Sequence, residues 1–159
     1  MTAQGKRARL MFSFFRGLVW LSLTVGAVSA AAAPPIVTDA WIRATPPGAV
    51  TAAAYLTMTS AGAADRLVGA ATPAAGAVEI HTQVVEAGSQ RMTRVAELTL
   101  PAGQVVRLSP GGQHLMLIDL TRPMVPGTKV ALSLRFAEAG TVEIDVPVVD
   151  ARAAAAATH

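Results

Sequence analysis

Four side chains of this 159-residue sequence could together hold a soft metal ion: His81, Met92, His114 and Met116. Imidazole nitrogen and thioether sulfur are uncharged, polarizable donors that suit Cu(I), whereas Mg²⁺ and Ca²⁺ prefer carboxylate oxygen. Zinc sites more often use cysteine or a carboxylate, and a blue-copper site needs a cysteine thiolate. The sequence contains no cysteine. The residue types therefore favour Cu(I), held by exchangeable ligands that allow its release.

The spacing of these residues is compatible with one site on a β-sheet. Ten residues separate His81 from Met92, 21 separate Met92 from His114, and one separates His114 from Met116. Residues i and i+2 of a strand point to the same side, so His114 and Met116 can reach one ion together. His81 directly follows the apolar position Ile80, which predicts that His81 faces away from the core.

Each of these residues also has an ordinary structural role as an alternative. A single methionine on a strand usually fills a gap in the core, and a single surface histidine is usually solvated. Met58 and Met124 are interpreted in this way, as packing residues. Residue types and spacing alone leave the metal site and separate structural roles open as alternatives.

The elements that must position these residues are predicted to be β-strands. Short runs with β-branched and alternating apolar residues are separated by Pro and Gly, which is typical of an antiparallel sandwich or barrel. Trp41 is expected to anchor the core. About nine strands are expected, over residues 37–45, 52–60, 65–71, 77–85, 91–100, 104–109, 113–120, 129–136 and 141–149. The predicted fold class is all-β.

Residues 1–30 are predicted to be a secretory signal peptide. They contain four Lys and Arg residues and no acid, followed by an apolar stretch over 17–27 and then small residues, which is the usual layout of such a leader. The apolar stretch is shorter than the about 20 residues of a transmembrane helix, and an uncleaved anchor is the alternative. No cysteine follows it, so lipid anchoring is not expected. Cleavage is expected after Ala30.

The predicted cleavage changes what the charge implies. The full sequence has 13 Lys and Arg against 10 Asp and Glu, and the leader holds four of the bases, which leaves nine bases and ten acids. This near-neutral balance, without a basic run, excludes the electrostatic pattern of a nucleic-acid-binding protein. Residues 31–150 are expected to form one β-sandwich domain. Residues 151–159 are expected to be a flexible alanine-rich tail.

The motif and its flanks resemble those of the periplasmic copper(I) chaperones of bacteria, the PCuAC-type family. In that family a His is followed by Met after ten residues and by His-x-Met after a further 21, as in this sequence. The flanking segments are similar as well: AWIRATPPGAVTAAAYLTM, DRLVGAATPAAGAVEIH and LSPGGQHLML. The resemblance extends over residues 40–148.

The resemblance implies a cupredoxin-like Greek-key β-sandwich that binds one Cu(I) per chain through His81, Met92, His114 and Met116. It implies a periplasmic carrier that supplies copper to the copper-A subunit of cytochrome c oxidase, often alongside Sco-type proteins, or serves copper homeostasis. The expected protein is a monomer without a stable membrane anchor after signal cleavage. Some members have Met directly after the first His, where this sequence has Thr82, so that position is not expected to contribute. Some relatives add a Met/His-rich C-terminal extension that binds Cu(II); this tail has a single histidine, and no second site is expected.

Two other functions are alternatives to the copper carrier. An enzyme could draw on acid–base candidates, but no G-x-S-x-G nucleophile motif and no glycine-rich phosphate loop is present. Those candidates are His81, Glu79, Asp119 and Ser109. An enzyme is therefore not expected. The second alternative is a metal-free β-sandwich module for adhesion or assembly in the periplasm, which would need no His/Met set.

Overall fold

The computed structural model describes residues 33–60, 62–86 and 88–150. The predicted signal peptide at residues 1–30 and the predicted tail at residues 151–159 lie outside the described residues. Within the described ranges, no helix has the length and apolar character needed to cross a membrane.

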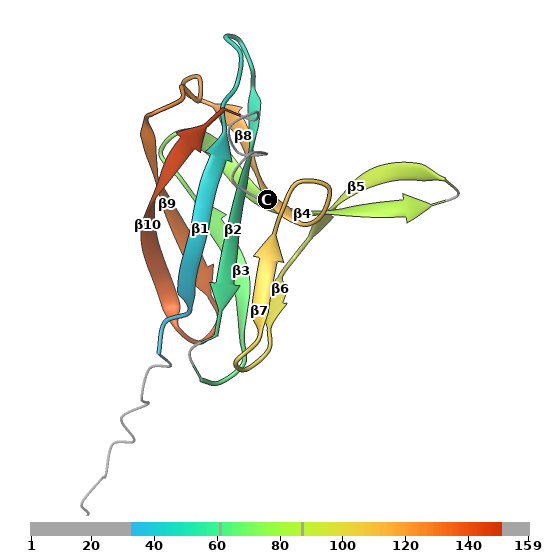
Figure 1. Cartoon of the computed structure of the whole chain (residues 1–159), viewed down its shortest axis with the longest axis vertical. Helices are drawn as coiled ribbons and strands as arrows, with labels where there is room; N and C mark the ends of the chain where they lie inside the picture. The colour runs from blue at the N-terminus through green and yellow to red at the C-terminus, as the bar shows by residue number, and fades with distance from the viewer. Residues whose placement is uncertain (1–32, 61, 87, 151–159) are drawn as a thin grey trace, which may run out of the picture.

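Ten β-strands make up the regular structure of the described residues (Figure 1). They are β1 (Ile36–Arg43), β2 (Thr51–Thr59), β3 (Asp65–Ala71), β4 (Ala75–Glu86), β5 (Ser89–Val95), β6 (Leu98–Leu100), β7 (Val105–Leu108), β8 (His114–Leu120), β9 (Lys129–Phe136) and β10 (Gly140–Val149). Eight of the predicted strands are confirmed close to their predicted bounds. The prediction of a single strand over residues 91–100 is wrong, because its first part pairs with β4 and its last part with β3, and the chain bends between them at Ala96 and Glu97.

The sheet closes on itself as a barrel. Its strand order is β5-β4-β8-β2-β1-β10-β9-β3-β6, and a further pairing of β3 with β4 joins seven of these strands in a ring. Strands β5, β6 and β7 are not part of the ring; they pair with its strands β4, β3 and β2, respectively. Among the ladders between the described strands, β1–β10 is parallel and the others are antiparallel. Two strands that are joined by a short hairpin are antiparallel. β1 and β10 can be parallel because they are not joined in this way: the other strands lie between them in the chain.

The core fills the barrel through the alternation of side chains along each strand. In β9, the positions Val130, Leu132, Leu134 and Phe136 are buried, and the residues between them are exposed or only partly buried. The predicted packing role of the two remaining methionines of the domain, at positions 58 and 124, is confirmed by their exposed fractions of 0% and 1%. The all-β prediction is confirmed as well. The alternating pattern predicted strands because side chains alternate with period two along a strand.

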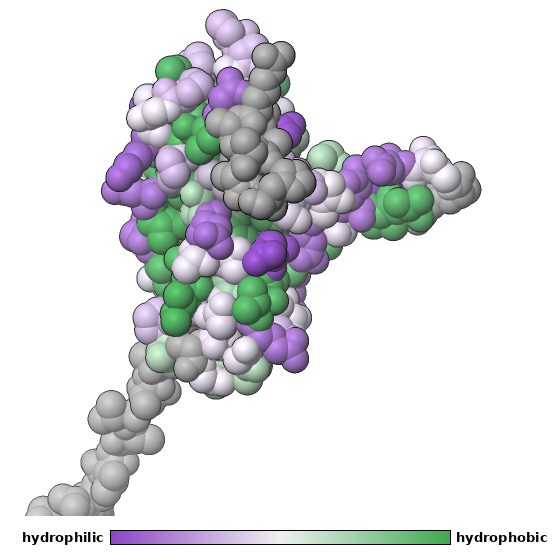
Figure 2. Space-filling model, in the orientation of Figure 1, coloured by the Kyte–Doolittle hydropathy of each residue, from purple (hydrophilic) through white to green (hydrophobic). Residues whose placement is uncertain are grey.

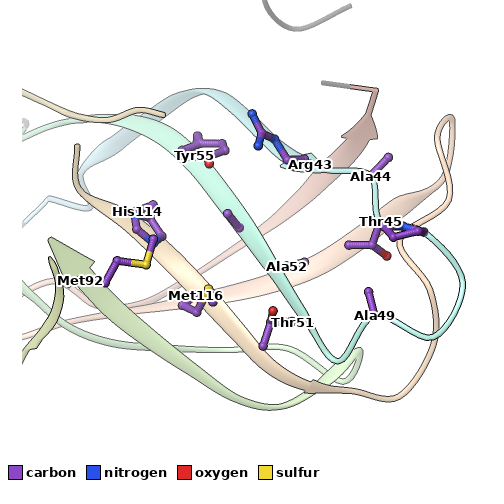
Figure 3. Close-up of a pocket in the computed structure, with 12 residues that line it drawn as sticks. Arg43, Ala44, Thr45, Ala49, Thr51, Ala52, Tyr55, Met92, His114 and Met116 are labelled. Carbon is purple, nitrogen blue, oxygen red and sulfur yellow. The ribbon is translucent and has the colours of Figure 1, made fainter. Parts of the chain in front are cut away.

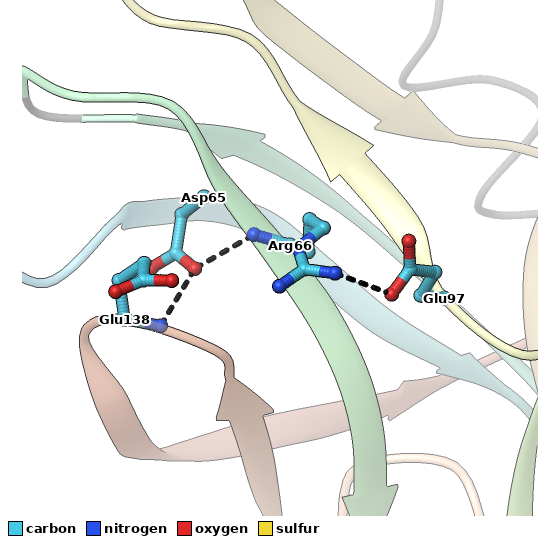
Figure 4. A network of polar contacts seen from close by, with 4 residues as sticks. All are labelled: Asp65, Arg66, Glu97 and Glu138. Carbon is cyan, nitrogen blue, oxygen red and sulfur yellow. Dashed lines mark hydrogen bonds and ion pairs between the residues drawn. The ribbon is translucent and has the colours of Figure 1, made fainter.

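A buried carboxylate fixes the turn between β9 and β10. Asp65, the first residue of β3, accepts hydrogen bonds from the backbone N–H groups of Arg66 at 2.7 Å and of Glu138 at 3.0 Å (Figure 4). The backbone N–H group of Ala139 donates a third, at 3.0 Å. Burial acts to raise the pKa of Asp65, but the backbone N–H donors together hold it below its usual value. On the surface beside it, the Arg66 guanidinium pairs with the Glu97 carboxylate at 3.0 Å.

Strands β4 and β5 form a hairpin arm that leaves the barrel (Figure 1). Residues 75–81 of β4 pair with β8, whereas residues 82–86 have β5 as their partner strand in the described structure. The arm presents both polar and apolar surface to solvent (Figure 2). Val85 and Met92, which lie on these two strands, are large exposed apolar residues. His81 therefore lies at the root of the arm, and Met92 lies along it.

Candidate metal centre

Strands β8, β4 and β5 place all four predicted ligands on one face of the sheet. His114 of β8 lies opposite His81 of β4, and Met92 of β5 lies opposite Gln83 of β4. Residues directly opposite each other in a ladder share a face, and so do residues two apart on one strand. His81 and Gln83 are two apart, as are His114 and Met116, so the register brings the four residues to the same side.

The other face of these strands belongs to the core. Ile80 of β4 and Leu115 of β8 are 4% and 0% exposed, which confirms that His81 faces away from the core. Exposure rises across the site, from 4% for the buried His114 to 53% for Met92 on the arm. The site is therefore closed behind His114 and open at Met92.

Two buried side-chain nitrogen or oxygen atoms of the described residues have no hydrogen-bond partner, and both are histidine nitrogens: His81 Nδ1 and His114 Nε2. The other nitrogen of each ring is engaged. His114 Nδ1 lies 3.1 Å from the Gly112 carbonyl oxygen, and His81 Nε2 lies 2.9 Å from Oε2 of Glu79. A carbonyl or carboxylate oxygen only accepts, so these contacts favour the neutral form of each ring that has its proton on the engaged nitrogen. The free lone pairs of His81 Nδ1 and His114 Nε2 fit a metal ion.

The methionines complete this donor set at a cavity of about 310 Å³ lined by Met92, His114 and Met116 (Figure 3). Figure 3 shows the Met92 side chain reaching toward the His114 ring, with Met116 farther along β8. His81 is not part of this lining, but its ring centroid lies 5.9 Å from that of His114. The structure thus brings three of the predicted residues to one cavity and places the fourth against the buried histidine.

The cavity continues along β2 from the methionines to Arg43. Its lining includes Ala53, which lies opposite Met116 in the β2–β8 ladder. Tyr55 of β2 is part of the lining as well (Figure 3). Burial raises the pKa of Tyr55, and the charge of Arg43 counteracts that rise only in part. Tyr55 is therefore a neutral phenol at physiological pH and does not add an anionic donor to the site.

Two aromatic rings lie in sequence beside His114. The Tyr55 ring centroid lies 6.2 Å from that of His114 and 4.5 Å from that of Trp41, which faces Tyr55 across the β1–β2 ladder. Such a wall holds the imidazole in place and limits the access of water to it. Neither ring was assigned to the site from the sequence, because their proximity to His114 depends on the pairing of β2 with β1 and β8.

The prediction that Trp41 anchors the core is wrong. A β-bulge in β1 inserts one extra residue between Thr38 and Trp41, and Asp39 within it has a φ of 51°. A bulge reverses the alternation of the residues that follow it. As a result Ile42, which is 0% exposed, takes the inward position, and Trp41 is only half-buried.

Glu79 is a site residue that the sequence suggested only as an acid for an enzyme. Its Oε2 atom contacts His81, and its Oε1 atom lies 3.1 Å from the guanidinium of Arg94 on β5. The hydrogen bond with His81, and to a smaller extent the charge of Arg94, hold the pKa of Glu79 below its usual value. The carboxylate is therefore charged. The signal in the sequence is its position two residues before His81, which puts both side chains on one face of the strand.

In the part of the chain that the structure describes, carboxylates form no site for a hard cation. Among the described residues, no group of three or more His, Asp or Glu side chains is arranged to hold a metal ion. The donor set on β4, β5 and β8 is therefore a soft one, made of imidazole and thioether.

The barrel is similar in structure to solved PCuAC domains. The copper-bound PCuAC domain from PmoF2 superimposes with a TM-score of 0.64 at 28% sequence identity, covering 76% of this chain and 97% of that domain. The Cu(I) form of DR1885 from Deinococcus radiodurans matches with a TM-score of 0.61 at 32% identity, covering 78% of this chain and 84% of that one. These likenesses confirm the cupredoxin-like fold and the PCuAC-type resemblance.

The sequence comparisons assign the chain to a family. Residues 36–148 match the family described as "Putative lipoprotein LpqE-like". The "Putative lipoprotein Lxx21020" of Leifsonia xyli subsp. xyli (strain CTCB07) is 35% identical over 115 residues, which are 72% of this chain and 69% of that protein. The chain belongs to the LpqE-like family. Lipoprotein is the name of those relatives; the present sequence contains no cysteine.

Proposed function

We propose that this protein is an exported, non-enzymatic carrier of one Cu(I) ion. The proposed ligands are Nδ1 of His81, Nε2 of His114 and the sulfur atoms of Met92 and Met116. One observation carries the proposal: the two buried side-chain nitrogens without a hydrogen-bond partner in the described residues belong to the two predicted histidine ligands. The copper-bound and Cu(I) forms of the similar PCuAC structures support it.

The chemistry of this donor set supports Cu(I) as the cargo. Thioethers and neutral imidazoles are soft donors, which favour Cu(I), and the set adds no charge to the ion. An unpaired nitrogen in a buried position costs free energy, and coordination by both rings would remove that cost. The charged carboxylate of Glu79 lies outside the donor set, where it partly balances the charge of the bound ion.

The open side of the site supports delivery rather than storage. Met92 is 53% exposed, and the cavity beside it leads from solvent to His114 and Met116. An incoming donor from an acceptor can therefore displace the exposed thioether while the buried histidine still holds the ion. We infer that the acceptor is the copper-A subunit of cytochrome c oxidase or a Sco-type protein, in the periplasm. In this proposal residues 1–30 are removed on export, and residues 31–150 act as a monomeric domain.

An anaerobic Cu(I) titration of the exported protein against a chromophoric chelator tests the proposal, with His114→Ala as the variant. The expected result is one equivalent of Cu(I) retained by the parent protein and lost by the variant. Failure of the parent protein to compete for Cu(I) would overturn the proposal and favour the metal-free adhesion or assembly module.

A further inference from the structure

Glu79 lies between one proposed ligand and a cation on the neighbouring strand. Its two carboxylate oxygens are divided between them: Oε2 lies 2.9 Å from His81 Nε2, and Oε1 lies 3.1 Å from the Arg94 guanidinium. The side chains of Glu79 and His81 are 24% and 16% exposed, whereas that of Arg94 is 69% exposed. The contact with His81 is therefore the shielded one, and the contact with Arg94 faces solvent.

The shielded contact determines which nitrogen of His81 can bind a metal. A neutral imidazole carries its proton on either ring nitrogen, and a neighbouring acceptor selects the one that is protonated. The Glu79 carboxylate has no proton to donate, so it stabilises the form with the proton on Nε2. Nδ1, which is buried and has no hydrogen-bond partner, then carries the lone pair.

We propose that Glu79 is a positioning residue of the copper site: its carboxylate keeps the proton of His81 on Nε2 and thereby directs Nδ1 toward the ion. This inference rests on the proposed function. The same contact fixes the rotation of the ring, because Glu79 and His81 are two apart on one strand and their side chains lie side by side. At His114 the backbone carbonyl of Gly112 has the same role, because it accepts a hydrogen bond from Nδ1 and leaves Nε2 for the ion.

Arg94 has a secondary part in this arrangement. It lies opposite His81 in the β4–β5 ladder and two residues from Met92 on the same face of β5. Its ion pair with Glu79 therefore joins the arm to the strand of His81 close to the methionine ligand. Because the pair is solvent-exposed, its loss should weaken copper binding by no more than about fivefold.

Substitution of Glu79 tests the role through Cu(I) affinity, measured by competition with a chelator under anaerobic conditions. Glu79→Ala should weaken binding by about 10- to 100-fold, the usual effect of losing a group that orients a metal ligand. Glu79→Gln keeps an oxygen that accepts the Nε2 proton and should recover most of that loss. Glu97→Ala is the matched control, since Glu97 also pairs with an arginine at 3.0 Å but lies outside the site, and it should leave the affinity unchanged.

The position of the proton gives a second measurement that a purely structural role of Glu79 would not affect. Nitrogen-15 NMR of the metal-free protein, recorded at a pH at which the spectrum shows a neutral ring, reports which nitrogen of His81 is protonated. We expect Nε2 in the parent protein and in Glu79→Gln, and a mixture of both forms in Glu79→Ala. A proton on Nδ1 in the parent protein, or an unchanged Cu(I) affinity in Glu79→Ala, would overturn the inference. If the parent protein binds no Cu(I), the proposed function fails, and the NMR result still decides whether Glu79 directs the ring.

Discussion

Replacement of Met92 by leucine separates copper binding from folding in a single variant. Leucine has a similar volume but no sulfur, so the substitution removes one proposed donor and leaves a side chain of the same character. Met92 is 53% exposed on the arm, and substitutions at such positions change the free energy of unfolding by about 0.5 kcal/mol or less. For a domain of this size that corresponds to a change in Tm of about 3 °C or less.

The expected effect on Cu(I) retention is much larger than the effect on stability. Loss of a group that only orients a metal ligand weakens binding by about 10- to 100-fold, and loss of a ligand itself should weaken it by at least as much. Met124→Leu is the matched control, because Met124 is 1% exposed in the core. Such a volume-conserving exchange in a core costs less than about 1.5 kcal/mol, and it should leave Cu(I) retention unchanged.

The two effects are measured in separate assays on the same samples. Thermal unfolding of the metal-free proteins, followed by circular dichroism, gives Tm, and anaerobic competition with a chromophoric chelator gives Cu(I) affinity. If Met92→Leu unfolded at a much lower temperature than the parent protein, Met92 would be a packing residue. If the variant retained Cu(I) as tightly as the parent protein, the four-ligand site would be wrong.

Two further substitutions test other parts of the structure. Asp65→Asn should lower stability at neutral pH by about 1–3 kcal/mol, because a carboxylate oxygen that accepts a backbone N–H group is replaced by an amide NH₂ that cannot. The lowered pKa of Asp65 means that its stabilisation is present above the ordinary aspartate pKa of about 3.9 and is lost as the pH falls through the lower folded-state value. Urea unfolding at several pH values should therefore show the two proteins converging in acid, and a constant difference would contradict this reasoning. Tyr55→Phe should leave Cu(I) affinity within about fivefold of the parent value, because a neutral phenol oxygen is not a soft ligand of the kind that Cu(I) prefers. Complete loss of binding in the chelator assay would make Tyr55 a ligand.

The strands themselves were largely predictable, because they depend on local pattern. The period-two alternation of residues 129–136 identifies both the strand and its buried face, and the structure confirms both. The break in residues 91–100 was not predictable in this way. Both halves of that segment have strand character, and what separates them is the choice of partner, β4 for one and β3 for the other.

The residues of the candidate site stand out in the sequence by their types and their spacing. That His114 and Met116 share a face follows from strand geometry alone. Strand geometry does not determine which nitrogen of each histidine is free, because that depends on contacts with Glu79 and with the Gly112 carbonyl. The outward position of Trp41 also required the structure, since a single extra residue in the β1 bulge reversed its direction.

The sequence by itself therefore determined the all-β class, the inward-facing positions of its regular strands and the soft chemistry of the donor residues. These are properties of residue types and of short-range periodicity. Only the tertiary structure decided that Met92 lies near His114, from which 21 residues of chain separate it, and that the site is closed at one end and open at the other. The physical reason is that both depend on the register of β5 and β8 against β4, and backbone pairing between distant strands leaves no local pattern in the chain.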